Sequence, residues 1–274
     1  MLSNSTEVVS FNYTLTPKSK FKTDYKGKSG VAYEVIRLVN GIPLFLDQHC
    51  NRLLNSLTTI EPGFKPDKVR LEKSILELIW KNNFYNTNIR IDIFGENILI
   101  YGIQSYYPSE KDFEQGVRVT LTSLERKNPK EKIYRELWKK DVEQRIADAK
   151  VFELLLVNKQ GLITEGSRSN VFFIRDNILF SPDESLILPG ITRSEIMKVA
   201  KVLGLLVEHT KIDKANLLSF DAAFLCGTSI KILPIAEIDE LSFNVNNTLL
   251  RKIQLAFNKH FEKEYRKSIK KWRK

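Results

Sequence analysis

Cysteine and long apolar runs are nearly absent from this 274-residue chain, and each absence excludes a class of protein. Only Cys50 and Cys226 are present, far apart and without partners at metal-ligand spacing, so neither a disulfide framework nor a zinc site is indicated. No apolar run approaches the roughly 18 residues that a membrane-spanning helix needs. The first residues also lack the basic start, apolar middle and cleavage site of a signal peptide. We therefore expect a cytoplasmic protein with no metal ion and no membrane partner.

Acidic residues are outnumbered, since 43 Lys and Arg face 33 Asp and Glu and the net charge is +10. The C-terminal segment Lys259–Lys274 contains eight Lys or Arg and two Glu, so it supplies +6 and leaves only +4 for the rest of the chain. A basic tail on a final helix is more often a solvated face than a nucleic-acid site. We therefore do not expect nucleic acid as a partner.

The composition that is present, 42% apolar and 28% charged residues, is that of a globular protein long enough for two domains. Residues 105–116 show little periodicity and are the best linker candidate. We therefore predict a small N-terminal α+β domain over residues 1–110 and a larger C-terminal domain over residues 117–274, joined by the linker 105–116.

The N-terminal part contains two β-hairpin patterns. Val31–Val39 is rich in β-forming residues, Asn40-Gly41 is a strong hairpin turn, and Ile42–Leu46 returns. Asn88–Phe94 and Ile98–Ile103 form the second pair. The sequence therefore predicts two antiparallel hairpins in this domain.

Two helices are predicted between these hairpins. Asp47 is expected to cap the first, which carries His49, Arg52 and Leu53. The second covers Asp67–Asn82, and its apolar face is formed by Val69, Ile75, Leu78 and Ile79. Two hairpins and two helices make one α+β unit.

Strands and helices alternate in the C-terminal part. The predicted strands are Val117–Leu124, Phe152–Val157, Val171–Arg175, Ile178–Phe180, Leu206–His209 and Ala222–Cys226. The predicted helices are Tyr134–Lys150, with Trp138, Val142, Ile146 and Ala149 at helical spacing, Thr192–Leu203, and a long helix from Thr248. Thr192 to Glu195 is a capping-box pattern, and Gly204 is a C-terminal stop signal.

The most informative stretch is polar and lies between two apolar runs. Leu162–Asn170 contains Glu165, Gly166 and Ser167 and separates Phe152–Val157 from Val171–Ile174. A carboxylate held between two buried strands is poorly suited to a core and well suited to face a ligand. The alternative is a surface turn with a solvated acid.

Three further features favour an anion. Leu188–Arg193 places a glycine before a helix start, whose free N–H groups and dipole attract a phosphate; the alternative is simply a well-capped helix. Cys226–Ser229 is a turn at a strand end whose amides and hydroxyls could form an anion-binding nest. Arg52 follows a hairpin, and together the three could surround one phosphate.

These residues carry a resemblance to class IV aminotransferases, the fold-type IV pyridoxal-phosphate enzymes. That family includes branched-chain and D-amino-acid aminotransferases and aminodeoxychorismate lyase. The resemblance covers roughly residues 30–240 and depends on five blocks in the family's order. The blocks are Tyr33–Arg37, Asp47–Leu53, Thr164–Asn170, Leu188–Arg193 and Gly227–Ser229.

The resemblance implies roles for individual residues. Glu165 would pair with the pyridine nitrogen of pyridoxal 5′-phosphate, so that the ring can act as an electron sink. The cofactor phosphate would be held by Arg52, the backbone amides of Ile191 and Thr192, Thr228 and Ser229. Because Phe152-Glu153 marks the strand that follows the family's lysine helix, the Schiff-base lysine would be Lys132. The asparagine that usually follows this lysine is missing, and Lys130 stays as the alternative.

Substrate residues are less defined. Tyr33 and Arg37 lie on an early strand and could face the substrate or point into the core. The branched-chain pattern Tyr-x-Arg-Pro is reduced here to Arg90, a possible carboxylate partner, and the Arg-x-His pattern of D-amino-acid enzymes is missing.

We therefore predict a two-domain α/β (α+β) fold-type IV protein with a β-barrel-like C-terminal domain, acting as a homodimer. It would use pyridoxal 5′-phosphate to move an amino group between an amino acid and a 2-oxo acid. The first alternative is a lyase that forms 4-aminobenzoate on the same fold. The second is a non-catalytic binding protein that uses its basic tail to hold a partner.

Overall fold

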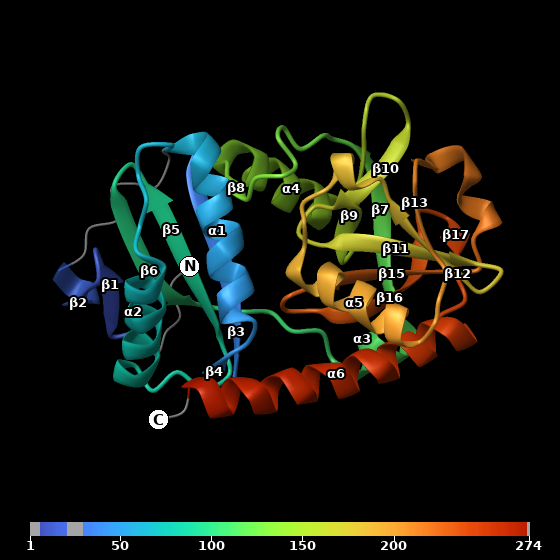
Figure 1. Ribbon diagram of the computed structural model, residues 1–274. Coiled ribbons are helices and arrows are strands. Elements are labelled where there is room, and N and C mark those ends of the chain that lie inside the picture. Colours follow the sequence, from blue (N-terminus) through green and yellow to red (C-terminus); the bar gives the residue numbers. More distant parts are fainter. Residues whose placement is uncertain (1–5, 21–29, 273–274) are drawn as a thin grey trace. The chain divides into compact units, whose positions relative to one another are not determined.

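The computed structural model describes residues 6–20 and 30–272, which form two compact units (Figure 1). Unit 1 consists of Met1–Tyr106, Glu131–Lys139 and Glu262–Lys274, and unit 2 of Tyr107–Lys130 and Lys140–Phe261. The chain first leaves unit 1 at Tyr106, inside the predicted linker, and this linker contains the short helix α3 (Glu110–Gln115). Two segments of the predicted C-terminal range thus belong to unit 1.

Unit 1 is built on a seven-stranded sheet in the order β2-β1-β6-β5-β3-β4, with β8 paired to β3. Its strands are β1 (Val8–Phe11), β2 (Thr14–Pro17), β3 (Val31–Val39), β4 (Ile42–Pro43), β5 (Asn88–Phe94), β6 (Asn97–Ile103) and β8 (Ile133–Tyr134). Both predicted hairpins, β3-β4 and β5-β6, are confirmed. Gly41, with φ +76°, supplies the left-handed residue that the first turn needs.

Helix α1 (Leu46–Ile60) corrects the predicted start. Strand β4 ends at Pro43, and Phe45 takes a left-handed conformation as the N-cap, with φ 54° and no side-chain cap hydrogen bond. Asp47 therefore lies inside the first turn, where its carboxylate pairs with Lys68. The prediction that Asp47 caps this helix is wrong, because the bend at Phe45 starts the helix before Asp47 is reached.

Helix α2 (Lys68–Lys81) begins as predicted, since the Asp67 carboxylate accepts hydrogen bonds from the first free N–H groups. Its buried face differs in one position: Val69 is 74% exposed, and Leu71 is fully buried. The core of unit 1 lies between the sheet and these helices and includes Ile36, Leu53, Leu57, Leu71, Ile75, Leu78, Ile89, Ile91 and Ile100.

Unit 2 is built on a ten-stranded sheet in the order β13-β12-β11-β15-β16-β7-β9-β10-β14, with β17 paired to β16. Its strands are β7 (Val117–Ser123), β9 (Glu153–Val157), β10 (Leu162–Gly166), β11 (Asn170–Arg175), β12 (Ile178–Pro182), β13 (Val207–Thr210), β14 (Ile212–Asp213), β15 (Ala222–Gly227), β16 (Lys231–Ile238) and β17 (Leu241–Ser242). Strand β7 pairs in parallel with β16 and β9. The predicted two-domain α/β fold is confirmed.

Strand β10 is one of the strands that the sequence did not predict, together with β1, β2 and β16. Leu162–Gly166 pairs with β9 on one side and β14 on the other, although the register shifts between Ile163 and Gly166. Glu165 therefore stands on a buried strand, and only residues 167–169 turn towards β11. The polar stretch is part of the sheet rather than a loop beside it.

Three longer helices are α4 (Glu136–Ala149), α5 (Ile191–Val202) and α6 (Thr248–Trp272). On α4 only Val142 is buried, so most of its predicted apolar stripe is partly exposed. The predicted capping box on α5 is wrong, because the N-cap is Gly190 and the Glu195 carboxylate lies 2.7 Å from His260 Nε2. Gly204, with φ +66°, follows the end of α5 as predicted.

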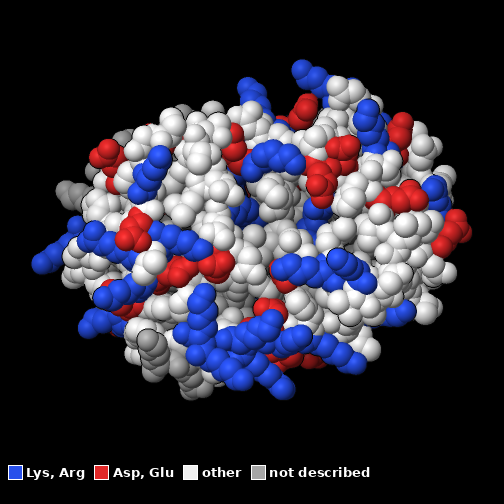
Figure 2. Space-filling model, in the orientation of Figure 1, with Lys and Arg blue, Asp and Glu red and all other residues white. Residues whose placement is uncertain are grey.

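Helix α6 carries the basic tail, and Lys and Arg side chains gather along it in Figure 2. The exposed cations of α6 are Lys252, Lys259, Lys263, Arg266, Lys267, Lys270 and Lys271. Across residues 6–20 and 30–272, no helix combines the length and the apolar character that a membrane crossing requires.

Candidate active site

Lys132 of unit 1 is anchored by its backbone beside strand β3. Its N–H donates to Ser56 Oγ at 3.2 Å, and its carbonyl oxygen accepts from Tyr33 N–H at 3.0 Å. Its Nζ lies 4.8 Å from the centroid of the Tyr33 ring. The residue precedes β8 and stands four positions before α4, so the strand pairing of β8 with β3 fixes where this lysine lies.

The same ring contacts Arg90. Arg90 Cζ lies 4.6 Å from the centroid of Tyr33 and 4.7 Å from that of Tyr134, so the guanidinium is packed between two aromatic rings. Its Nε donates to Asp92 at 2.7 Å, and the Tyr101 hydroxyl donates to the other oxygen of Asp92 at 2.7 Å. Arg90 is thereby held in one orientation.

The predicted substrate residues of β3 are separated along the strand. Tyr33 pairs with Asp92 and Arg37 with Asn88, so Arg37 lies four residues further along, roughly 13 Å at strand spacing. Both are half-buried, whereas the alternating positions Glu34 and Ile36 face the core. Tyr33 lies beside Lys132, and Arg37 lies towards the other end of the hairpin.

A buried carboxylate that the sequence did not single out, Glu34, holds Arg52. Arg52 donates through Nε and Nη2 to the two carboxylate oxygens, at 2.8 and 2.7 Å, and Val35 N–H donates to one of them at 2.8 Å. His49 Nδ1 lies 3.2 Å from the same oxygen. The only sequence signal for Glu34 was its place in the inward-facing series Ala32, Glu34, Ile36 of β3. A buried acid at such a position requires a partner.

These contacts decide the charges of the cluster. Burial raises and Arg52 and His49 lower the pKa of the Glu34 carboxyl, and the net result lies well below its ordinary range. Burial lowers the pKa of His49, and Glu34 only partly opposes this. Glu34 is therefore an anion, Arg52 a cation and His49 neutral near pH 7.

In unit 2, Glu165 is 2% exposed, so the alternative of a solvated surface turn is wrong. Its Oε1 accepts from Arg126 Nε at 2.7 Å, and its Oε2 accepts from Leu188 N–H at 3.0 Å. Arg126 also donates from Nη2 to the Ser167 carbonyl oxygen at 3.1 Å. Arg126 is a site residue that sequence reasoning missed, since it is 39 residues away from its partner.

The other end of the polar motif holds the same loop. Asn170 Nδ2 donates to the Leu188 carbonyl oxygen at 3.0 Å, so Glu165 and Asn170 together bind both polar groups of one backbone residue. A Cβ on Gly190 would lie 1.9 Å from Asn170 Oδ1, so only glycine fits there. The motif thus places the loop that leads into α5, where Ile191 and Thr192 begin the helix.

The second predicted anion seat lies next to the first. Asn170 pairs with Cys226 in the sheet, and a Cβ on Gly227 would lie 3.7 Å from Ser169 Cβ. The turn with Thr228 and Ser229 follows directly. Unit 2 therefore brings the start of α5 and this turn together around Asn170, whereas Arg52 belongs to unit 1.

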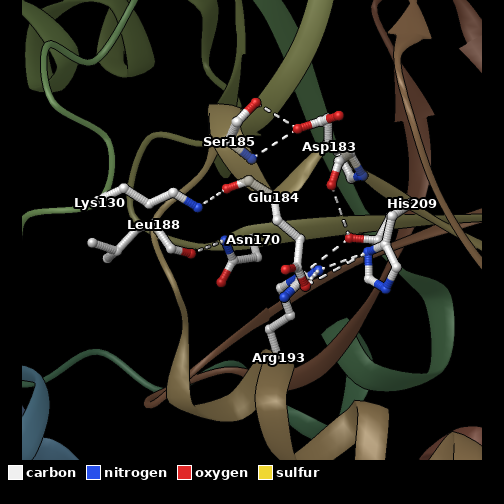
Figure 3. A network of polar contacts seen from close by, with 10 residues as sticks. Lys130, Asn170, Asp183, Glu184, Ser185, Leu188, Arg193 and His209 are labelled. Carbon is white, nitrogen blue, oxygen red and sulfur yellow. Dashed lines mark hydrogen bonds and ion pairs between the residues drawn. The ribbon is translucent and has the colours of Figure 1, made fainter.

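Figure 3 shows the polar contacts that surround the loop before α5. Arg193 donates to Ser181 Oγ at 3.1 Å, to Glu184 at 3.0 Å and to His209 Nδ1 at 3.0 Å. Lys130, the alternative lysine, is exposed and donates from Nζ to the Glu184 carbonyl oxygen. Lys130 is thus an exposed surface group, whereas Lys132 is partly buried and contacts the Tyr33 ring.

A sequence profile of amino-transferase class IV matches residues 31–238, which is most of the chain. The chain belongs to the class IV aminotransferase family. It is similar to the D-alanine aminotransferase of Bacillus licheniformis, with 27% identity over 95% of this chain and 99% of that protein. It is also similar to the D-alanine aminotransferase of Listeria monocytogenes, with 30% identity over 78% of this chain and 80% of that one.

Solved structures agree on the fold of this class IV aminotransferase. The branched-chain aminotransferase of Thermoproteus uzoniensis with norvaline has a TM-score of 0.84 and 23% identity, and the match covers 96% of this chain and 97% of that one. The branched-chain amino acid aminotransferase of Thermobaculum terrenum in its PLP form has a TM-score of 0.82 and 23% identity, over 96% of each chain. This similarity supports the α/β architecture over nearly the whole length. The chemistry must be argued from the residues of this chain.

Proposed function

We propose that this class IV aminotransferase uses pyridoxal 5′-phosphate to move an amino group between an amino acid and a 2-oxo acid. The observation that supports this most directly is Glu165. It is buried and ion-paired, yet it accepts only two hydrogen bonds from described residues, whereas a carboxylate offers about four acceptor positions. A buried acid with spare acceptor capacity suits a protonated ring nitrogen.

The donor set of unit 2 also fits the cofactor's phosphate. The N–H groups of Ile191 and Thr192 begin α5 at Gly190, whose contact with Asn170 allows no side chain, and Thr228 and Ser229 follow Gly227 nearby. Orphan N–H groups at a helix start attract an anion. Arg52 of unit 1 would add a guanidinium, and Glu34 orients it through two of its five N–H donors.

Lys132 would bind the cofactor covalently and, once released by a substrate amine, would move the α-proton. The bound cofactor supplies an electron sink for that step. The Tyr33 ring lies against the Lys132 ammonium group, and Ser56 and the Tyr33 backbone hold its main chain. The backbone contacts fix the main chain of Lys132, and the Tyr33 ring lies 4.8 Å from its Nζ.

Arg90 would bind a substrate carboxylate. Tyr33 and Tyr134 cover the guanidinium, and Asp92 takes Nε, which leaves the Nη1 and Nη2 edge without a hydrogen-bond acceptor among the described residues. That edge matches a bidentate carboxylate. Arg37, further along β3, would act at a more distant part of the substrate.

The test is reconstitution with pyridoxal 5′-phosphate, borohydride reduction and peptide mapping, followed by assays with L- and D-amino acids and 2-oxo acids. We expect reduction to mark Lys132 and the rates to follow a ping-pong pattern. Release of 4-aminobenzoate without an acceptor would favour the lyase, and no cofactor binding would favour a non-catalytic protein. We also propose a homodimer, which light scattering would test.

A further inference from the structure

Arg126 has no role in the assignments above, although it forms the closest contact to Glu165. It lies between β7 and β8, its side chain is 9% exposed, and its Nε lies 2.7 Å from Glu165 Oε1. Through Nη2 it also binds the Ser167 carbonyl oxygen at 3.1 Å. One guanidinium thus bridges the side chain of Glu165 and the backbone two residues later.

This bridge restricts the carboxylate in two ways. The last torsion of a glutamate is broad, so a carboxylate held by one hydrogen bond can rotate. Here Arg126 holds one oxygen and Leu188 N–H holds the other, and the plane of the group is defined. The guanidinium also places a positive charge 2.7 Å from Glu165 Oε1, so this hydrogen bond is charge-assisted.

We propose that Arg126 is a positioning residue that keeps Glu165 an oriented anion, so that a proton shared with the cofactor ring stays on the ring nitrogen. This inference rests on the proposed function. Without Arg126, Glu165 becomes a better proton acceptor in a buried site, and the nitrogen can lose its proton to the carboxylate. No proton leaves the pair, but the ring becomes a weaker electron acceptor.

The contacts of Leu188 indicate that removing Arg126 should leave the phosphate-binding residues in place. Leu188, which Glu165 contacts, is also held by Asn170 through its carbonyl oxygen. The hydrogen bond from Asn170 to Leu188 does not involve Arg126, so it should still hold the loop before α5 when Arg126 is removed. Loss of Arg126 should change the protonation of the ring more than the affinity for the phosphate.

The experiment uses the holoenzyme with ring-¹⁵N-labelled pyridoxal 5′-phosphate. Arg126→Met removes the charge and the hydrogen bonds at similar length, and Arg126→Gln keeps a donor without the charge. Arg145→Met is the matched control, because Arg145 binds Asp141 at 2.9 Å and Thr122 at 3.1 Å, away from Glu165. The readouts are the ¹⁵N chemical shift between pH 6 and 9 and the cofactor dissociation constant.

We expect wild type and Arg145→Met to keep the protonated-nitrogen shift throughout, and Arg126→Met to show a shift moved towards the unprotonated nitrogen at every pH in this range, because the proton moves within the pair. Affinity for the cofactor should change by less than about 10-fold, and half-reaction rates should fall by about 10-fold or more, still less than the ~10²-fold typical of a direct stabiliser. Combined with Glu165→Gln, Arg126→Met should add no further shift, because the two residues act as one pair.

An unchanged ¹⁵N shift in Arg126→Met, with cofactor bound, would overturn the inference while leaving the proposed function intact. If Arg126→Met does not fold, Arg126→Gln decides: a shift equal to wild type at every pH refutes the role of the charge, and a shift moved towards the unprotonated nitrogen supports it. A wild-type protein that binds no cofactor at Lys132 would overturn the proposed function and this inference together.

Discussion

Two buried carboxylates, one in each unit, are each paired with an arginine, yet their surroundings differ. Glu34 is fully buried and accepts hydrogen bonds from Arg52 twice and from Val35, with His49 also at 3.2 Å. Glu165 accepts one hydrogen bond from Arg126 and one from a backbone N–H. The protein uses nearly all acceptor positions of Glu34 and leaves some acceptor positions of Glu165 without a donor among the described residues.

The difference teaches that an acid–arginine pair does not by itself identify a site. Glu34 serves the folded state, because it neutralises Arg52 and fixes the direction of its guanidinium. Glu165 is held in one orientation, but its hydrogen-bond acceptor capacity is only partly used. Spare acceptor capacity in a fixed carboxylate is therefore the feature that separates a binding group from a structural one.

The largest effect is expected for Lys132, in comparison with Lys130. Lys132→Ala should abolish amino transfer and the borohydride-reducible bond to the cofactor, because it removes the amine that lies beside Tyr33. Lys130→Ala should behave as wild type, since Lys130 is exposed. Mass spectrometry of the reduced protein measures this, and retention of the adduct in Lys132→Ala would move the assignment.

Glu165→Gln tests the spare acceptor directly. Gln keeps the shape and an acceptor oxygen but loses the charge that holds a proton on the ring nitrogen, so turnover should fall at least ~10²-fold. Cofactor affinity should fall only modestly. Steady-state rates at saturating cofactor decide the matter, and near-wild-type turnover would show that Glu165 is as structural as Glu34.

Glu34→Gln should have its main effect on stability. It leaves the Arg52 charge buried without an anion, and breaking such a pair costs roughly 3–5 kcal/mol of unfolding free energy. The control is Glu237→Gln, which breaks the exposed Arg118–Glu237 pair and should change stability by less than about 1 kcal/mol. Urea denaturation without cofactor measures both, and equal small losses would contradict the structural role of Glu34.

Acid should weaken the Glu34 cluster in two steps, first through His49 and then through Glu34. Since burial lowers the pKa of His49 in the folded state, only the unfolded chain takes up this proton just below about pH 6.5, and stability should fall with pH there. Glu34, whose pKa is also lowered, contributes until the pH falls below about 4.3. His49→Gln should flatten the upper part of the profile, and an unchanged slope between pH 7 and 5.5 would contradict this.

The smallest effect is expected for the basic tail. Charge reversal at Lys263, Lys267 and Lys270, all exposed on α6, should leave amino transfer within about 2-fold, because exposed substitutions rarely exceed ±0.5 kcal/mol. A loss of activity with cofactor still bound would instead indicate that the tail contacts a substrate or another subunit.

Local signals predicted much of the fold. The Asn40-Gly41 turn and the Gly204 stop each act within a few residues, and the structure confirms both. Two other local signals, the Asp47 cap and the Thr192–Glu195 capping box, were wrong. Glu195 was predicted to complete a cap three residues away, but it contacts His260, 65 residues later, because the packing of α6 brings a hydrogen-bonding partner to a buried acid.

The sequence by itself determined the order of the elements, the polar motif around Glu165 and the family, because periodicity, turn residues and motif order are properties of neighbouring positions. Only the tertiary structure decided which charges meet. Arg52 reaches Glu34 across 18 residues and Arg126 reaches Glu165 across 39, and no local pattern encodes either pair. Burial makes each pair necessary, because a charge removed from water must be neutralised by whichever partner the fold brings within hydrogen-bond distance.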